Sequence, residues 1–171
     1  MRESLALRMM AEGIPLTVDW GIDLFDFRLR QIHAHWAALH RGEAMPLKQD
    51  FRASDLRSVL PYLFLVDVLR APDDFRLRLA GTHFETFAQA RLTGKRVTEA
   101  FPPEFSAAVL KLWGEAVETR RPLHAIGQLW VPSRNYVRWE GIILPLVSDN
   151  GAIEQLLGGV VFSYPPKNQA A

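Results

Sequence analysis

The sequence contains no cysteine among its 171 residues. This excludes disulfide scaffolds, thiolate zinc sites, iron–sulfur clusters and catalysis by a thiol nucleophile. It also excludes the cysteine adducts through which some photosensors hold flavin or bilin. The sequence also has almost no excess of positive or negative charge, since its formal net charge is +1. General binding of nucleic acid needs a concentrated basic face, so we expect no nucleic-acid partner.

Long hydrophobic runs are also lacking. The longest apolar stretches, at 142–147 and 156–162, are far shorter than the ~20 residues that a membrane-spanning helix needs. Charged residues at Glu3, Arg8 and Glu12 interrupt any candidate secretion signal. We therefore expect a cytoplasmic protein that has no membrane partner.

The chain is 49% hydrophobic, and its length fits one domain with a full core. We expect an N-terminal arm at 1–22, a single domain at 23–164 and a frayed tail at 165–171. A helix is predicted at 23–41, because apolar residues recur at spacings of four and three until Gly42. This stripe consists of Phe25, Leu29, Ile32, Trp36 and Leu39. Two interpretations stay open: the stripe packs on the protein's own sheet, or it forms a homodimer interface.

Five strands are expected after this helix, at 62–69, 75–80, 123–131, 136–147 and 153–164. A short helical turn is expected at 54–60, before the first strand. Between the second and third strands, a short helix is expected near 83–91 and a long helix at 103–119. Ser54 and Thr82 are predicted as helix N-caps, with Glu85 completing a capping box. Strands at 62–69, 142–147 and 156–162 are apolar at both parities, so they should be central. We predict an α+β fold whose antiparallel sheet has the order 2-1-5-4-3.

Three ordered segments carry a family resemblance. They are residues 35–42 (HWAALHRG), 60–67 (LPYLFLVD) and 75–82 (FRLRLAGT), the last followed by Leu92-Thr93-Gly94. Together they resemble a stand-alone bacterial PAS domain subfamily known mainly from alphaproteobacteria, over residues 24–164. The resemblance implies the PAS fold, with helices on one face of the sheet and the N-terminal helix on the other or at a dimer interface. One departure is Gln89, where such proteins usually have glycine, so a backbone conformation open to them is expected to be closed here.

Residues with catalytic or metal-binding chemistry are few. His33 and His35 point to different faces of the predicted helix, and His33 and His40 lie about 10 Å apart along it, so we expect no metal site. No nucleophile–base pair is apparent, and we expect no enzymatic activity. Asp67, the one acid inside a central strand, is the only candidate for a small cone-fold isomerase or dehydratase.

Aromatic residues suggest a ligand site between the curved sheet and the long helix. The candidates are Phe84 and Phe87 on the short helix, Val109 and Trp113 on the long helix, and Gln128, Trp130 and Trp139 on the sheet. Gln128 is expected to point inward and to orient the ligand. The alternative is that these aromatic side chains only fill the core.

We therefore expect a stand-alone sensory or regulatory PAS domain that binds a small apolar or aromatic molecule of unknown identity. Its signal would pass to an unidentified signalling protein by direct contact, and the chain is expected to form a homodimer. The alternative is a ligand-free PAS module that serves only in dimerisation or docking.

Overall fold

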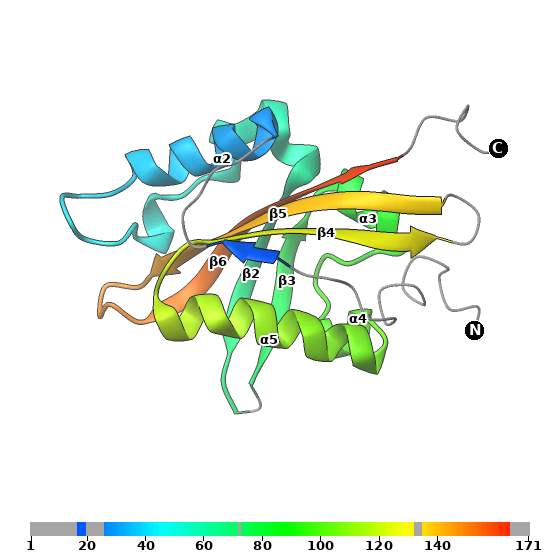
Figure 1. Cartoon of the computed structure of the whole chain (residues 1–171). Coiled ribbons are helices and arrows are strands. Elements are labelled where there is room, and N and C mark those ends of the chain that lie inside the picture. Colours follow the sequence, from blue (N-terminus) through cyan, green and yellow to red (C-terminus); the bar gives the residue numbers. More distant parts are fainter. Residues whose placement is uncertain (1–16, 20–25, 72, 132–134, 165–171) are drawn as a thin grey trace.

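A computed structural model describes residues 17–19, 26–71, 73–131 and 135–164. Its centre is one antiparallel sheet in the order β1-β4-β5-β6-β2-β3 (Figure 1). The strands are β1 (Thr17–Asp19), β2 (Leu63–Leu69), β3 (Asp74–Ala80), β4 (Leu123–Val131), β5 (Asn135–Val147) and β6 (Ile153–Ser163). Strands β2 to β6 confirm the predicted order 2-1-5-4-3. The sequence did not predict β1, which lies within the expected arm and pairs with the edge of β4.

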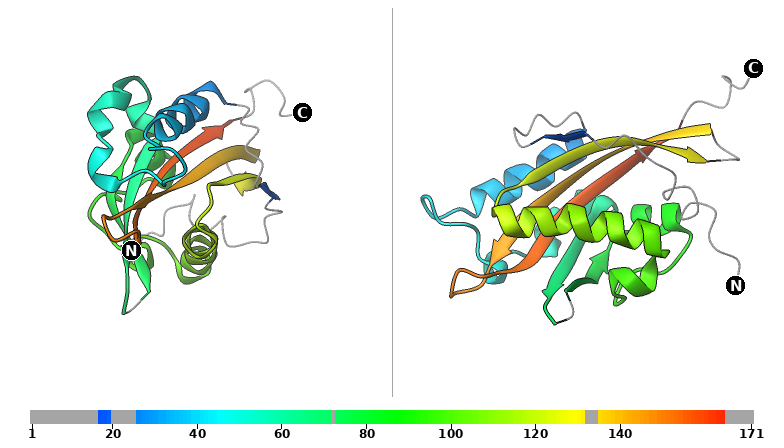
Figure 2. Two further views of the ribbon diagram at one scale, coloured as in Figure 1. Left: turned by 90° about the vertical axis from the view of Figure 1, so that its left-hand side faces the viewer. Right: turned by 60° about the horizontal axis from the view of Figure 1, so that its bottom comes forward.

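Helical segments cover both faces of this sheet (Figures 1 and 2). The inner face, as we call it, carries α3 (Thr82–Ala88), α4 (Val97–Ala100) and α5 (Pro103–Thr119). The outer face carries α2 (Phe27–Ala38) and the 3-10 segment η2 (Ala53–Tyr62), with the short η1 (Lys48–Asp50) between them. The two faces hold separate hydrophobic clusters, which explains why the central strands are apolar at both parities.

The helix α2 packs on the outer face of its own sheet. Leu29, Ile32 and Trp36 are buried in one cluster with the outward side chains of β5 and β6. The indole Nε1–H of Trp36 donates to the carbonyl of Pro145 over 2.9 Å. A Cβ built on Gly159 would lie 2.7 Å from the tips of Leu29 and Ile32, so the helix approaches the strand closely at this glycine. Of the two interpretations of the stripe, the structure therefore shows packing within one chain.

Local expectations at three helix ends are corrected. Ser54 lies inside η2 rather than capping it, and α3 begins after Gly81 without a side-chain cap. The carboxylate of Glu85 instead accepts the backbone N–H groups of Leu92 and Thr93, which fixes the loop after the helix. At Gln89 the backbone is left-handed, with φ 52° and ψ 35°. The conformation that favours glycine is thus adopted here by glutamine, because it ends α3 at its C-cap.

Candidate functional site

The aromatic side chains of the inner face form a packed cluster. Trp113 is 4% exposed, and its ring lies 5.3 Å from that of Phe64 and 5.5 Å from that of Phe75. The Phe84 ring lies 5.8 Å from that of Phe64. A Cβ built on Gly158 would lie 2.1 Å from the Phe64 ring, so this cluster rests directly on the backbone of β6. The sequence analysis did not include Phe64 and Phe75 in this site. Alternation along their strands could have placed both side chains on the inner face.

A second part of the cluster joins α3 to the end of β6. The ring of Phe87 stacks on that of Phe162, with centroids 3.6 Å apart and planes inclined by 6°. Val109 is also buried on this face, from α5. The structure thus brings Phe84, Phe87, Val109 and Trp113 into one core, where the first two and Trp113 already have aromatic partners within the protein.

Trp139 differs from these residues. It is only partly buried against the inner-face core, and its ring contacts no other ring of the described residues. A Cβ built on Gly127 would lie 2.6 Å from its Nε1, and one on Gly141 would lie 3.4 Å from its six-membered ring. The indole therefore lies flat on the sheet over two positions that have no side chain. Its Nε1 is buried and has no hydrogen-bond partner among the residues that the structure describes.

The expected inward orientation of Gln128 is wrong. Gly127 is the residue of β4 directly opposite Trp139, and Gln128 pairs with Arg138. Since side chains alternate along a strand, Gln128 falls on the outer face, where it is exposed. A register that differs by one residue reverses the face of every side chain in the strand. Trp130 pairs with Tyr136 along the backbone, and its side chain lies outside what the structure describes.

A polar contact links the outer face to the start of α2. The carboxylate of Glu140, the residue after Trp139, accepts the backbone N–H of Asp26 over 3.1 Å. The same carboxylate lies 3.0 Å from Nε2 of His124, whose side chain is 4% exposed. Asp26 is the N-cap of α2, so a single side chain of β5 connects the start of this helix with the neighbouring strand β4. Glu140 was not singled out by sequence reasoning, which expected it only to face outward.

A second contact region surrounds His83. Its Nε2 accepts the backbone N–H of Phe162 over 3.0 Å, and its ring lies 4.6 Å from that of Tyr62. The guanidinium of Arg28 lies 4.2 Å from the centre of the Tyr62 ring and forms two hydrogen bonds with Asp26. Burial lowers the pKa of His83, the charge of Arg28 lowers it further, and that of Asp26 opposes the change. The neutral imidazole is therefore the form that fits this position.

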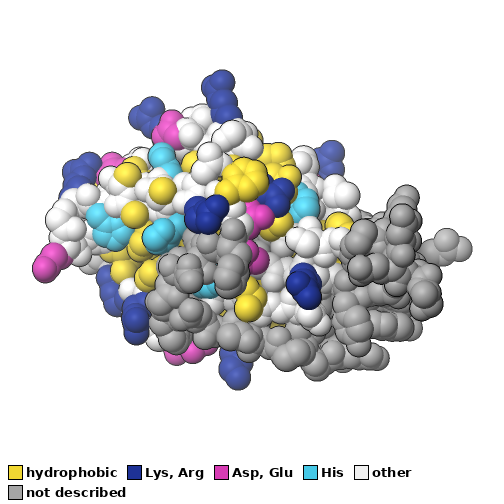
Figure 3. Space-filling view, turned by 45° about the horizontal axis from the view of Figure 1, so that its top comes forward, with side chains coloured by type: hydrophobic (Ala, Val, Ile, Leu, Met, Phe, Trp, Pro, Cys, Tyr) yellow, Lys and Arg dark blue, Asp and Glu magenta, His cyan; other side chains and the backbone are white. Residues whose placement is uncertain are grey.

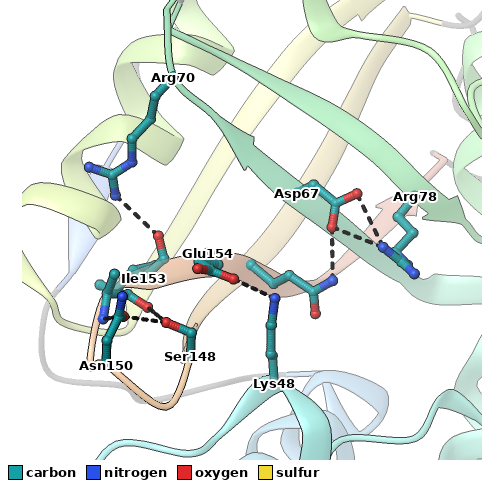
Figure 4. Close-up of polar contacts among 10 residues, drawn as sticks. Lys48, Asp67, Arg70, Arg78, Ser148, Asn150, Ile153 and Glu154 are labelled. Carbon is teal, nitrogen blue, oxygen red and sulfur yellow. Dashed lines mark hydrogen bonds and ion pairs between the residues drawn. The ribbon is translucent and has the colours of Figure 1, made fainter.

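Asp67, the one candidate for acid catalysis, is held in a polar network on the outer face (Figure 4). It accepts a hydrogen bond of 2.8 Å from Gln155 and lies 3.4 Å from the guanidinium of Arg78. Lys48 of η1 pairs with Glu154 beside it. These contacts bring charged residues of β2, β3 and β6 together with η1, which is the arrangement of a structural network.

Surface chemistry adds little that resembles a binding site. Among the described residues, no three His, Asp or Glu side chains gather as a metal site would require. Within the same parts of the chain, no helix has the length and apolar character needed to cross a bilayer. Seen from the side that carries α2, basic, acidic and histidine side chains are interspersed with hydrophobic ones (Figure 3). This view shows no concentrated basic face of the kind that binds nucleic acid.

Comparisons with known proteins give the family of the chain but no curated relative. No curated protein is matched. One similar solved structure is described as a light-oxygen-voltage domain studied with a flavin analogue; it shares 13% identity, has a TM-score of 0.46, and the match covers 68% of this chain and 86% of that one. Another, an RNA-binding light-oxygen-voltage receptor, shares 14% identity at a TM-score of 0.43, over 87% of this chain and 38% of that one. Identities of this size say nothing about what this chain binds. The model of the PAS domain family matches residues 26–161, and the chain therefore belongs to the PAS domain family.

Proposed function

We propose that this chain is a sensory or regulatory PAS domain that binds a small apolar or aromatic molecule and passes the change to a partner protein. PAS domains are in general sensory or signalling modules, and they typically have no catalytic activity. The observation that supports a ligand here is the state of Trp139. A large indole that is only partly buried and has no ring partner in the described part of the chain, on an otherwise packed face, offers a surface for an aromatic molecule.

The position of Trp139 also supports a route for the signal. Its neighbour Glu140 points to the opposite face and holds the N–H of Asp26 at the start of α2. A ligand that moves the backbone of β5 at Trp139 would thus disturb the contact that anchors this helix. The helix lies on the outside of the molecule, and its first residue, Phe27, is 60% exposed. We therefore propose α2 as the element through which a partner detects the ligand. A homodimer in the cytoplasm remains part of this hypothesis.

A thermal-shift screen of small aromatic and apolar metabolites with the full chain tests the proposal. A ligand that binds only the folded state at a hundredfold excess over its Kd stabilises by about 2.7 kcal/mol. For a domain of this size that is a rise of roughly 5–11 °C in melting temperature. Trp139→Ala should abolish the rise, whereas Gln128→Ala, on the other face of the sheet, should retain it. A hit that keeps its full shift in Trp139→Ala would place the site elsewhere.

The docking module is the second candidate, and the tight stacking of Phe87 on Phe162 favours it. If aromatic rings fill the inner face, the protein needs no ligand to complete its core. This candidate predicts that no small molecule raises the melting temperature, while disturbing α2 still changes the binding of a partner. The same screen therefore separates the two functions.

A further inference from the structure

In the part of the chain that the structure describes, the end of β6 has a neighbouring strand on one side only. Strand β5 continues beside β6 as far as Ser163, whereas β2 stops at Leu63, which pairs with Gly159. Backbone groups of β6 beyond Gly159 that face the β2 side therefore need other partners. For the N–H of Phe162 that partner is the imidazole of His83, whose Nε2 accepts it over 3.0 Å. A side chain of α3 thus takes the place of a strand carbonyl.

The same helix holds Phe162 a second time. Residues 83 and 87 are four positions apart, so they lie on one side of α3. The ring of Phe87 stacks on the ring of Phe162, with centroids 3.6 Å apart. Phe162 is 5% exposed, so these two contacts close the inner-face core at this end of the sheet.

The hydrogen bond from Phe162 fixes the protonation state of His83. A backbone N–H can only donate, so Nε2 must offer its lone pair, and the single ring proton is on Nδ1. A protonated imidazole carries hydrogen on both nitrogens and accepts nothing. Two N–H groups would then point at each other. The contact between α3 and the end of β6 therefore exists only while His83 is neutral.

The start of α2 lies close enough to respond to a charge on His83. Burial lowers the pKa of His83, the positive charge of Arg28 lowers it further, and the charge of Asp26 opposes this. The Tyr62 ring lies between the two cationic groups, with its centre 4.6 Å from that of the imidazole and 4.2 Å from the guanidinium carbon. A proton gained by His83 therefore repels the guanidinium of Arg28.

The other titratable side chains around the imidazole do not neutralise such a charge. On η2 the neighbour is the ring of Tyr62. Glu85, two residues further along α3, already accepts two backbone N–H groups of the following loop. On β6, Tyr164 is 42% exposed. The carboxylate of Asp26 is occupied by its two hydrogen bonds to the guanidinium at the start of α2.

We propose that His83 is a pH switch that connects α3, the end of β6 and the start of α2. The neutral imidazole holds Phe162 on α3. On acidification the protonated ring releases the N–H of Phe162 and displaces Arg28, so that the start of α2 changes together with the end of β6. This inference goes beyond the proposed function, because it makes acidity an input to α2 that requires no ligand.

NMR titration of the full, isotope-labelled chain between about pH 5 and pH 8 tests the proposal. The chain has five histidines, and His83→Gln identifies the ring resonances of His83. We expect its midpoint below 6.5. The amide resonance of Phe162 and the Nε–H resonance of Arg28 should move with the same midpoint.

His33→Gln is the matched control. His33 is also half-buried, and burial lowers its pKa too, but it lies on α2 and its ring packs beside that of Trp36. Its replacement should leave the responses of Phe162 and Arg28 unchanged.

Hydrogen exchange provides the second measurement. A neutral hydrogen bond corresponds to roughly a 2- to 12-fold change in an equilibrium constant. We expect the protection of the Phe162 amide to fall by that factor below the midpoint of His83, relative to Leu157, which lies between β2 and β5. In His83→Gln the protection of Phe162 should not follow this titration, because an amide side chain gains no charge.

Four results would overturn the proposal. His83 could titrate while the Phe162 amide does not respond at its midpoint, or the response of Phe162 could persist in His83→Gln. A His83 midpoint at or above 6.5 would contradict the expected preference for the neutral form. A response of Phe162 without one of Arg28 would refute the connection to α2. Backbone assignment of the unsubstituted protein provides the test even if the variant does not fold, and none of these outcomes depends on the proposed ligand.

Discussion

Shortening Ile32 to alanine should destabilise the protein strongly, because this side chain fixes α2 to the sheet. Ile32 is fully buried, and its Cδ1 would lie only 2.7 Å from a Cβ built on Gly159. The alanine leaves a cavity that the helix cannot close without moving relative to β6. Buried Ile→Ala substitutions cost about 2–5 kcal/mol. At 2–4 °C per kcal/mol, the melting temperature should fall by roughly 4–20 °C.

The assay is thermal unfolding at several protein concentrations, with Gln31→Ala as the control on the exposed side of the same helix. The control should stay within about 0.5 kcal/mol of the unsubstituted protein. Since Ile32 is buried within one chain, the loss in Ile32→Ala should not depend on concentration. A melting temperature that stays unchanged in Ile32→Ala, or a loss that disappears at high concentration, would refute packing within the chain and favour a dimer interface.

Three other predictions concern single positions. The pKa of His83 in the folded protein lies below its ordinary value of 6.5, so protonation favours the unfolded chain. The contribution of neutral His83 to the free energy of unfolding should be fully present above pH 6.5 and should be lost as the pH drops toward the folded pKa. Urea unfolding at several pH values should show a shallower loss of stability for His83→Gln. An equal dependence on pH in both proteins would contradict this. Gly158→Ala forces a Cβ into the Phe64 ring and should lower the free energy of unfolding by at least about 1–3 kcal/mol. Gly114→Ala adds a Cβ in open space within α5 and should raise it by about 0.5–1 kcal/mol. Equal denaturation midpoints for the two variants would disprove this contrast. Gln89→Gly should raise the free energy of unfolding by roughly 1 kcal/mol, because glycine adopts the left-handed conformation without strain. A lower denaturation midpoint for this variant would contradict the prediction.

The aromatic site was only partly predictable, and the reason is the register of one hairpin. The sequence correctly indicated that Trp139 faces the helices, since Arg138 and Glu140 flank it. It did not indicate that Gly127 rather than Gln128 pairs with it. That pairing depends on the turn between β4 and β5, and a shift of one residue exchanges the faces. As a result, Trp139 is opposite a glycine on the inner face, and the amide of Gln128 lies on the outer face.

The sequence by itself determined strands β2 to β6, their order in the sheet and the apolar stripe of α2, but not the edge strand β1. Alternating and two-sided apolar patterns reflect burial directly, so β2 to β6 and the stripe of α2 could be read from them. Only the tertiary structure decided what each buried face touches. Phe64 packs on Gly158, Ile32 packs on Gly159, and Glu140 accepts the N–H of Asp26, 114 positions away. Such contacts join residues that are distant along the chain, and periodicity carries information only about near neighbours. The signal route proposed for Trp139 depends on one such contact, between its neighbour Glu140 and the N–H of Asp26.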